Sequence, residues 1–287
     1  VVDVSGEDFD SCLEMVAKNN QILADDVLEK FPIEYFSMNT GVFYDLNREE
    51  NTEKIISHTN TARRKAREQM DGICAYTEEL AQAELLRADV LHSFQSALEK
   101  EEFILYFQPK ISGMDESITS AEVLVRWQRA DGAILGPDKF ISVLEECGKV
   151  EALDFYVYEK AFQWMVSQRE CRTQPVTLSL NISPFHFRDI EGFTKKLLDI
   201  INKYEIDTRY LIFEITESAY IRNRDAVNGM ISILHAYHIR ISMDDFGSGY
   251  SSLNTLKDIA FDEVKIDKSF LDGSLTEKGR IVLQEIF

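Results

Sequence analysis

Side chains able to bind a divalent cation recur at the ends of strand-like runs in the second part of the sequence. Glu122, Asn181, Glu214 and Asp244 each lie toward the end of an apolar run, and Asp245 follows Asp244 directly. Carboxylate and amide oxygens are the ligands that Mg²⁺ and Mn²⁺ prefer. Carboxylates that converge without a cation repel one another, so the set predicts a two-metal site that activates water for displacement at phosphorus.

Three more polar side chains lie at the same ends of these runs. Arg126 follows Glu122, Glu217 follows Glu214, and Lys265 lies on the run after Asp244. Glu217 is placed to anchor, by hydrogen bonds, the loop F-G-S-G-Y-S-S, whose glycines adopt backbone angles closed to other residues. A single buried carboxylate of this kind is often a paired structural group, and that alternative stays open for each residue taken alone.

The elements that must position these residues alternate between strands and helices. Strands are expected at 103–111, 118–128, 176–183, 210–218, 239–246 and 261–270. Helices are expected at 137–148, 152–170, 193–205, 225–238 and 251–259. This rhythm, with about 30 residues per unit, predicts a parallel sheet covered by helices. Six strands in one series, with no G-x-G-x-x-G after the first, favour a (β/α) barrel, whose chemistry lies at the carboxyl ends of its strands.

The first part of the sequence predicts a smaller α+β domain. Two helices, at 9–30 and 51–70, flank two short strands expected within 32–45. A long helical stretch without glycine or proline then follows, at 78–103. The expected organisation is a first domain at 1–82, a helical connector at 83–102 and a second domain at 103–287.

The composition of the 287 residues narrows the classes of function. The formal net charge of −19 opposes non-specific binding to DNA or RNA. The four cysteines are far apart and form no C-x-x-C, a pattern typical of buried thiols in a reducing cytoplasm. No apolar run reaches the ~18 residues of a membrane helix. We therefore expect a soluble, cytoplasmic chain without membrane contact, although the full-length protein can carry upstream sensory or membrane segments.

Five ordered motifs resemble the EAL family of cyclic di-GMP phosphodiesterases. They are E-V-L-V-R-W, L-N-I-S, F-E-I-T-E-S, D-D-F-G-S-G-Y-S-S-L and V-K-I-D-K-S-F, and Y-F-Q-P-K-I resembles the family's opening strand. The resemblance runs from about Phe103 to the last residue. It implies a TIM-like (β/α)8 barrel, commonly with an antiparallel first strand, which hydrolyses cyclic di-GMP to linear pGpG using Mg²⁺ or Mn²⁺, two ions per site.

The resemblance also implies a role for each residue of the site. Glu122, Asn181, Glu214 and Asp244 are implied metal ligands, and Asp245 is implied to serve the second metal and to activate water. The other implied roles are to orient or polarise that water (Lys265), to hold a substrate phosphate (Arg126), to line the pocket (Gln108) and to stabilise the loop after the fifth strand (Glu217). Because that loop takes part in dimerisation in this family, a homodimer is expected.

The residues before the barrel resemble the second half of a GGDEF (diguanylate cyclase) domain, through S-M-N-T-G-V-F and H-T-N-T-A-R-R-K-A-R. The G-G-D/E-x-F signature is not in this sequence, so no cyclase activity is expected of this stretch. The barrel departs from its family by reading Glu122-Val123-Leu124, with valine for alanine, and by ending after its sixth strand. We therefore expect a piece of a longer protein, with a catalytically inactive cyclic di-GMP receptor as the alternative to a phosphodiesterase.

Overall fold

The computed structural model describes residues 9–31, 36–44, 51–67, 72–171, 175–247 and 261–268. The chain divides into two units, Val1–Asp89 and Val90–Phe287. Helix α3 (Glu78–Glu99) contains the boundary between them, within the stretch expected to be a helical connector.

The first unit is built on a parallel pair of short strands. Its elements are α1 (Phe9–Lys30), β1 (Thr40–Val42), α2 (Thr52–Ala66) and β2 (Ile73–Ala75). The side chain of Asn51 caps α2 by accepting a hydrogen bond from the backbone N–H of Lys54. β1 approaches α2 so closely that a Cβ on Gly41 would overlap the carbonyl oxygen of Thr59, which is why glycine is needed there.

The expected helices of this unit are seen, but its strands are predicted only in part. The helices at 9–30 and 51–70 correspond to α1 and α2. One of the two strands expected within 32–45 is β1, and residues 32–35 lie outside the described residues. β2 is not predicted, because a strand of three residues is too short to show an alternating pattern.

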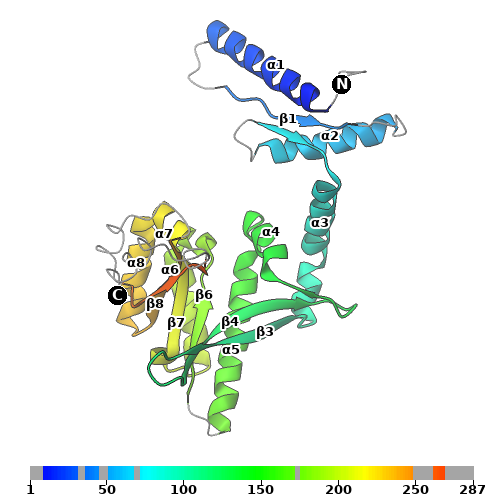
Figure 1. Ribbon diagram of the computed structural model, residues 1–287. Helices are drawn as coiled ribbons and strands as arrows, with labels where there is room; N and C mark the ends of the chain where they lie inside the picture. Colours follow the sequence, from blue (N-terminus) through cyan, green and yellow to red (C-terminus); the bar gives the residue numbers. More distant parts are fainter. Residues whose placement is uncertain are drawn as a thin grey trace. The chain divides into compact units, whose positions relative to one another are not determined.

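The second unit contains a sheet of seven strands (Figure 1). They are β3 (Phe103–Ile111), β4 (Ile118–Gln128), β5 (Ile134–Leu135), β6 (Thr177–Asn181), β7 (Leu211–Thr216), β8 (Arg240–Phe246) and β9 (Glu263–Ile266). β4, β6, β7, β8 and β9 follow one another in parallel, whereas β3 and the short β5 both pair with β4 in antiparallel fashion. The six expected strands and the antiparallel first strand are thus confirmed, while the β5 hairpin is not predicted.

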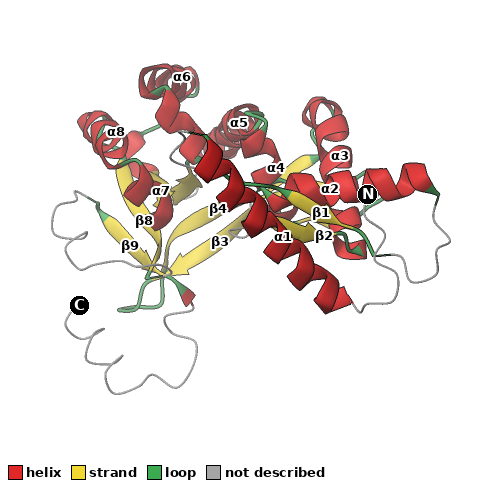
Figure 2. Cartoon of the chain, turned by 90° about the horizontal axis from the view of Figure 1, so that it is seen from above, coloured by secondary structure: helices red, strands yellow, loops and turns green. Residues whose placement is uncertain are grey.

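The helices of this unit follow the strands in the expected alternation. They are α4 (Ile141–Glu146), α5 (Val150–Glu170), α6 (Ile190–Lys203), α7 (Glu217–Arg222) and α8 (Arg224–Ala236), with short 3₁₀ helices η1 (Pro137–Lys139), η2 (Pro184–Arg188) and η3 (Thr208–Tyr210). Figure 2 shows α5, α6 and α8 along one face of the curved sheet. The helix expected at 251–259 lies outside the described residues. Among the described strands β3 and β9 are the two edges of the sheet, so closure into a (β/α)8 barrel is not seen there.

The two faces of this sheet differ in chemistry because side chains alternate along each strand. The face toward the helices is apolar: Leu178, Leu180, Phe213, Ile215 and Met243 are fully buried. The alternate positions carry polar groups on the inner face, in register from strand to strand: Asn181 lies beside Glu214, and Thr216 beside Asp244. Polar side chains thus take positions that apolar layers fill in most TIM barrels.

Trp127, which follows Arg126 in the sequence, is fully buried and packs against Phe103 and Phe140. Its position in β4 points it to the helix side of the sheet, away from Glu122. Cys12 and Cys74 are buried as expected. The other two, Cys147 and Cys171, are exposed, because both follow the last turn of a helix.

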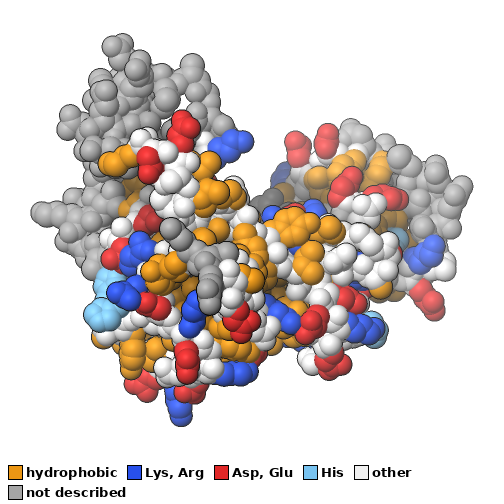
Figure 3. Space-filling model, turned by 90° about the horizontal axis from the view of Figure 1, so that it is seen from below, with side chains coloured by type: hydrophobic (Ala, Val, Ile, Leu, Met, Phe, Trp, Pro, Cys, Tyr) orange, Lys and Arg blue, Asp and Glu red, His pale blue; other side chains and the backbone are white. Residues whose placement is uncertain are grey.

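The surface carries charges of both signs. On the face drawn in Figure 3, acidic and basic side chains are interspersed with apolar ones. In the part of the chain that the structure describes, none of the helices has a stretch apolar and long enough to cross a bilayer.

Candidate active site

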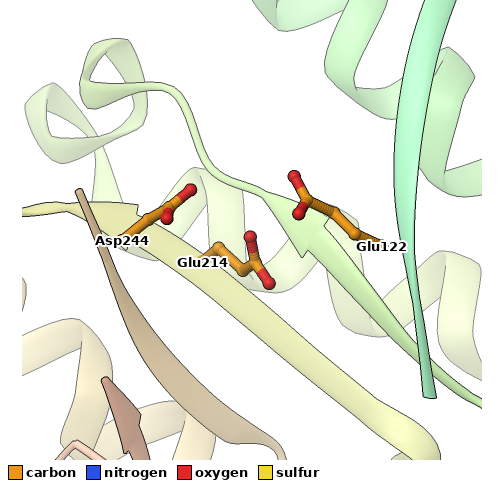
Figure 4. A group of neighbouring side chains, drawn as sticks. All are labelled: Glu122, Glu214 and Asp244. Atoms are coloured by element: carbon orange, nitrogen blue, oxygen red, sulfur yellow. The ribbon is translucent and has the colours of Figure 1, made fainter. Parts of the chain in front are cut away.

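Three carboxylates from three different strands meet on the inner face of the sheet. Glu122 lies on β4, Glu214 on β7 and Asp244 on β8, and one oxygen of each lies within 4.8 Å of the others. Figure 4 shows the three side chains pointing toward one another. The strands are parallel, and Glu214 and Asp244 lie toward their carboxyl ends, as the sequence predicts. Glu122 lies in the middle of β4, at the end of the part of that strand that pairs with β6.

The ammonium group of Lys265, on β9, lies among these carboxylates. Its Nζ is 2.9 Å from Oε2 of Glu122, 2.6 Å from Oε2 of Glu214 and 3.0 Å from Oδ2 of Asp244. Burial favours the neutral amine, but the hydrogen bonds and charges of Glu122 and Glu214 outweigh it and raise the pKa of Lys265 above its ordinary value. Lys265 therefore stays charged and offsets part of the repulsion among the three carboxylates.

Glu214 is the most deeply buried member of the site. Its side chain has no exposed surface, and each of its oxygens accepts from a different lysine: Oε2 from Lys265, and Oε1 from Lys110 at 2.9 Å. An ionised carboxylate in this position is tolerated because both of its oxygens have charged donors.

Asn181 ends strand β6 next to this cluster. Its side-chain amide nitrogen lies 3.5 Å from Oε1 of Glu122. The hydroxyl of Tyr158, on α5, donates to the backbone oxygen of Asn181 at 2.8 Å, and the next backbone N–H, of Ile182, donates to the carbonyl of Glu214 at 3.0 Å. Asn181 is therefore positioned by neutral hydrogen bonds from α5 and β7.

Asp245 lies at the edge of the site and does not join the carboxylate cluster. The described acidic side chains whose oxygens lie within 4.8 Å of one another are Glu122, Glu214 and Asp244, without Asp245. Asp245 is exposed, adopts the left-handed backbone conformation (φ 57°) and donates its backbone N–H to Oδ1 of Asp244 at 2.9 Å. Partial burial of its carboxyl, together with the negative charges of Asp244 and Asp267, raises the pKa of Asp245.

Glu217 begins helix α7 directly after β7 and is 2% exposed. Its Oε2 accepts from the backbone N–H of Gly247 at 3.0 Å, which ties it to the end of the segment that carries Asp244. Gly247 has φ 93°, a conformation that favours glycine. Among the described residues Oε1 of Glu217 has no hydrogen-bond partner. Most of the loop that Glu217 is predicted to anchor, from residue 248 on, lies outside the described residues.

The two predicted substrate-binding residues lie on β3 and β4. Gln108 is exposed and lies opposite Glu122 in the antiparallel register. The guanidinium of Arg126 lies 5.5 Å from the centre of the Tyr106 ring, and its Nη1 donates to the carbonyl of Val125 at 2.8 Å. Gln108 and Arg126 alternate with apolar residues along their strands, which puts them on the same face as Glu122.

Several polar residues of this region are missed by reasoning from the sequence. Lys110 and Glu263 join the inner face below the cluster, where their Nζ and Oε1 atoms lie 2.7 Å apart. On α5, Asp154 pairs with His186 of η2, with 2.8 Å between Oδ2 and Nε2. Lys110 and Gln108 lie two apart on one strand, and so do Glu263 and Lys265, so alternation could have placed both on the site's face; nothing in the sequence pairs Asp154 with His186.

The donor set fits a divalent cation. Three carboxylates and one amide, all with hard oxygen atoms, are available from Glu122, Glu214, Asp244 and Asn181. A positively charged group, the ammonium of Lys265, already lies within 3.0 Å of all three carboxylates. The position is thus one that attracts a cation, and Lys265 and a metal ion would compete for the same oxygens.

The second unit matches a known domain family. Residues 91–287 match the model of the EAL domain. The chain is 30% identical over 240 residues to cyclic di-GMP phosphodiesterase PdeR of Escherichia coli (strain K12), covering 83% of this chain and 36% of PdeR. It is 34% identical over 186 residues to probable cyclic di-GMP phosphodiesterase PdeB of the same organism, covering 63% of this chain and 35% of PdeB. The chain thus spans about a third of the length of these curated relatives.

Solved structures show the same fold. The PaMucR phosphodiesterase in complex with c-di-GMP superposes with a TM-score of 0.63 and 27% identity, over 69% of this chain and 80% of that one. The Vibrio cholerae LapD fragment described as S helix-GGDEF-EAL, bound to c-di-GMP, gives a TM-score of 0.64 over 98% of this chain and 66% of that one. Its identity is 19%, so this second likeness concerns the fold alone.

Proposed function

The chain belongs to the EAL domain family, and from this membership we propose that its second unit hydrolyses cyclic di-GMP to linear pGpG with the help of Mg²⁺ or Mn²⁺. The observation that carries the proposal is the convergence of Glu122, Glu214 and Asp244 around one cationic position. Relatives named cyclic di-GMP phosphodiesterases support the choice of substrate.

The side chains of the site divide the work between binding ions and binding substrate. Glu122, Asn181, Glu214 and Asp244 would hold the ions, two per site, with Asp245 nearby at the rim. Bound Mg²⁺ or Mn²⁺ supplies charge stabilisation at the phosphodiester and lowers the pKa of a water molecule. Bound ions would reverse the negative charge of the carboxylate cluster, so an anionic substrate could bind at this acidic site.

The remaining residues act on the substrate and on proton transfer. Arg126 would hold a phosphate, since its guanidinium is a bidentate donor held over the Tyr106 ring at 5.5 Å. Gln108, exposed and opposite Glu122, would line the pocket. Lys265 would orient the attacking water, and Asp245 would accept a proton from that water.

We extend the proposal to the organisation of the chain, with a GGDEF-like domain at 1–82, a connector at 83–102 and the EAL domain from 103 on. The support is the alignment over 98% of this chain with a LapD fragment described as S helix-GGDEF-EAL. We also propose a homodimer formed through the EAL domain, as in the family that the motifs resemble. The loop implied in that contact, after β8, lies outside the described residues.

The test is hydrolysis of cyclic di-GMP by the full-length protein. We expect Mg²⁺- or Mn²⁺-dependent formation of pGpG, and a fall of at least about 100-fold in kcat/KM for Glu122→Gln, because a lost metal ligand removes several kcal/mol of transition-state stabilisation. Glu170→Gln, an equal change at an exposed position at the end of α5, is the control and should leave the rate unchanged.

Two results would overturn the proposal. Turnover that survives Glu122→Gln would show that the carboxylate cluster does not carry the reaction. Binding of cyclic di-GMP by the wild type without any turnover, in the presence of either metal, would identify a receptor rather than a phosphodiesterase.

A further inference from the structure

The ammonium group of Lys110 occupies a second, deeper position on the inner face of the sheet. Its Nζ lies 2.9 Å from Oγ of Ser179, 2.9 Å from Oε1 of Glu214 and 2.7 Å from Oε1 of Glu263. A lysine ammonium has three N–H donors, and all three have acceptors here. Lys110 is therefore held in one orientation by residues of β6, β7 and β9.

Glu214 joins this deeper position to the carboxylate cluster. Lys110 contacts only Oε1 of Glu214, whereas Lys265 contacts only Oε2. Oε2 is also the oxygen on the side of Glu122 and Asp244, because Lys265 bridges all three. The two lysines thus hold opposite oxygens of one carboxylate whose side chain has no exposed surface.

The two lysines respond differently to a divalent ion. Lys265 shares all three of its acceptors with the proposed metal site, so an ion that binds these oxygens competes with it. Lys110 has only one acceptor in common with the proposed metal site, Glu214, and it contacts the oxygen of Glu214 that faces away from the cluster. Its other acceptors, Ser179 and Glu263, are not among the proposed ligands. Lys110 can therefore keep its contacts whether or not an ion is bound.

We propose that Lys110 is a positioning residue for the metal site: it holds the buried Glu214 carboxylate by Oε1 so that Oε2 remains directed at the ions. This inference rests on the proposed function and concerns a residue to which neither the motifs nor the relatives give a role. Partners of this kind, which bind a ligand rather than the metal, change metal affinity by about 10- to 100-fold when they are removed.

Lys110 and Glu263 carry opposite charges, so changing both residues separates the loss of positioning from a change in net charge. Removing the positive charge of Lys110 alone would strengthen the attraction of the site for a cation, which opposes the effect of lost positioning. The double variant Lys110→Met/Glu263→Gln removes one charge of each sign and leaves the net charge of the inner face as it is. If Lys110 acted only through its charge, this variant would bind ions like the wild type.

The measurement is Mn²⁺ binding by the full-length protein, followed by the electron paramagnetic resonance signal of free Mn²⁺, with thermal melting as a check on folding. We expect the dissociation constant of the double variant to rise at least about 10-fold. The matched control is Lys160→Met/Glu101→Gln, which removes an ion pair of the same length, 2.7 Å, on the outside of the same unit and should change nothing. If the double variant does not melt cooperatively, Lys110→Gln replaces it, because charge alone predicts tighter binding for that variant and lost positioning predicts weaker binding.

The outcomes are distinct. Weaker Mn²⁺ binding in the Lys110 variants, with the control unchanged, supports the inference. A wild type that binds Mn²⁺ together with a folded double variant that binds it equally well overturns the inference and leaves the proposed function standing. A wild type that binds no Mn²⁺ overturns the proposed function, and the inference with it.

Discussion

The two sides of the site, around Asn181 and around Asp244, are held by different kinds of force. At the backbone of Asn181 itself the hydrogen bonds join neutral groups: Tyr158 donates to the backbone oxygen of Asn181 at 2.8 Å, and Ile182 donates to the carbonyl of Glu214 at 3.0 Å. Neither of these hydrogen bonds involves a lysine or a carboxylate of the cluster. The backbone of Asn181 is therefore positioned in advance by the packing of α5 against the sheet.

The support of the Asn181 side continues into the segment that follows. In η2, the His186 ring pairs with Asp154 of α5 at 2.8 Å, and the Ser183 hydroxyl donates to Glu145 at 2.7 Å. His186 is 4% exposed and its ring lies 4.3 Å from that of Phe193. The turn after Asn181 is thus fixed to helices α4, α5 and α6 by buried contacts.

The Asp244 side depends on charge instead. Asp244 is held by the ammonium of Lys265, at 3.0 Å, and by the backbone N–H of Asp245, at 2.9 Å. Asp245 takes a left-handed conformation that costs a non-glycine residue free energy. The difference between the sides indicates that the backbone of Asn181 is positioned without a cation, whereas the three carboxylates need one, either Lys265 or a metal ion.

The largest effect is expected from removing the ammonium group of Lys265, the cation that lies among the three carboxylates. Lys265→Met leaves three carboxylates without their shared donor, so the Asp244 side should lose its order until a metal binds. We expect kcat/KM to fall at least about 100-fold, because the side chain proposed to orient the attacking water is lost. We also expect Mg²⁺ to raise the Tm of this variant more than that of the wild type, because the competitor for the oxygens is gone.

The measurements are initial rates of cyclic di-GMP hydrolysis and thermal melts with and without Mg²⁺. Lys160→Met, on the outside of α5, is the control for loss of a lysine and should show the wild-type response to Mg²⁺ in both measurements. An equal rise in Tm for the wild type and Lys265→Met would mean that Lys265 and the metal do not compete, and the contrast between the two sides would fail.

A smaller effect is expected from Tyr158→Phe, which removes one neutral hydrogen bond and leaves the ring in place. The backbone oxygen of Asn181 then loses a buried donor, which should lower the free energy of unfolding by about 1–2 kcal/mol. The rate of hydrolysis should fall several-fold, while the response of the Tm to Mg²⁺ should stay as in the wild type.

Tyr156 offers a matched control for this change on the same helix. Its hydroxyl donates to the backbone oxygen of Phe103 at 3.1 Å, away from the carboxylates. Tyr156→Phe should therefore destabilise the protein by a comparable amount and leave the rate unchanged. Chemical denaturation and initial rates of both variants provide the test, and equal rates for the two would show that Tyr158 does not position Asn181.

Much of the second unit can be predicted from the sequence because its strands are recognised from patterns within short stretches of the chain. Strands at 103–111 and 118–128 follow from alternation and apolar runs, and they correspond to β3 and β4. The proximity of Glu214 and Asp244 follows from one rule, that the carboxyl ends of parallel strands share a rim. Glu122 joins them from the middle of β4, at the end of the part that pairs with β6.

The remaining features depend on contacts between distant parts of the chain. Lys110 and Glu263 are 153 positions apart, and only the curvature of the sheet brings β3 and β9 near enough for an ion pair. Asp154 reads as a helix residue with no special pattern, yet it contacts His186 in η2. The exposure of the Asp245 side chain also escapes prediction, because a left-handed residue at the end of a strand turns its side chain out of the alternating pattern.

The smallest expected effect concerns the Asp154 carboxyl and its dependence on pH. Burial raises the pKa of Asp154 above its ordinary value of 3.8, a shift that the hydrogen bond and charge of His186 oppose and the charge of Glu145 reinforces. A carboxyl whose pKa is raised by folding contributes stability that is complete below pH 3.8 and is lost as the pH rises through the raised value. Asp154→Asn removes this dependence and keeps a side chain able to hydrogen-bond to His186, so stability near neutral pH should change by less than about 1.5 kcal/mol.

The test is the difference in free energy of unfolding between wild type and Asp154→Asn, measured by urea denaturation at a series of pH values from below 3.8 upward. We expect the free energy of unfolding of the wild type to fall relative to that of Asp154→Asn as the pH rises, and the difference then to level off. Asp207→Asn supplies the opposite sign, because the hydrogen bond from Arg209 lowers the pKa of Asp207 and its contribution is lost as the pH falls. A difference for Asp154 that moved in favour of the wild type with rising pH would mean that the ion pair with His186 dominates over burial, and the Asn181 side would then depend on charge, as the Asp244 side does.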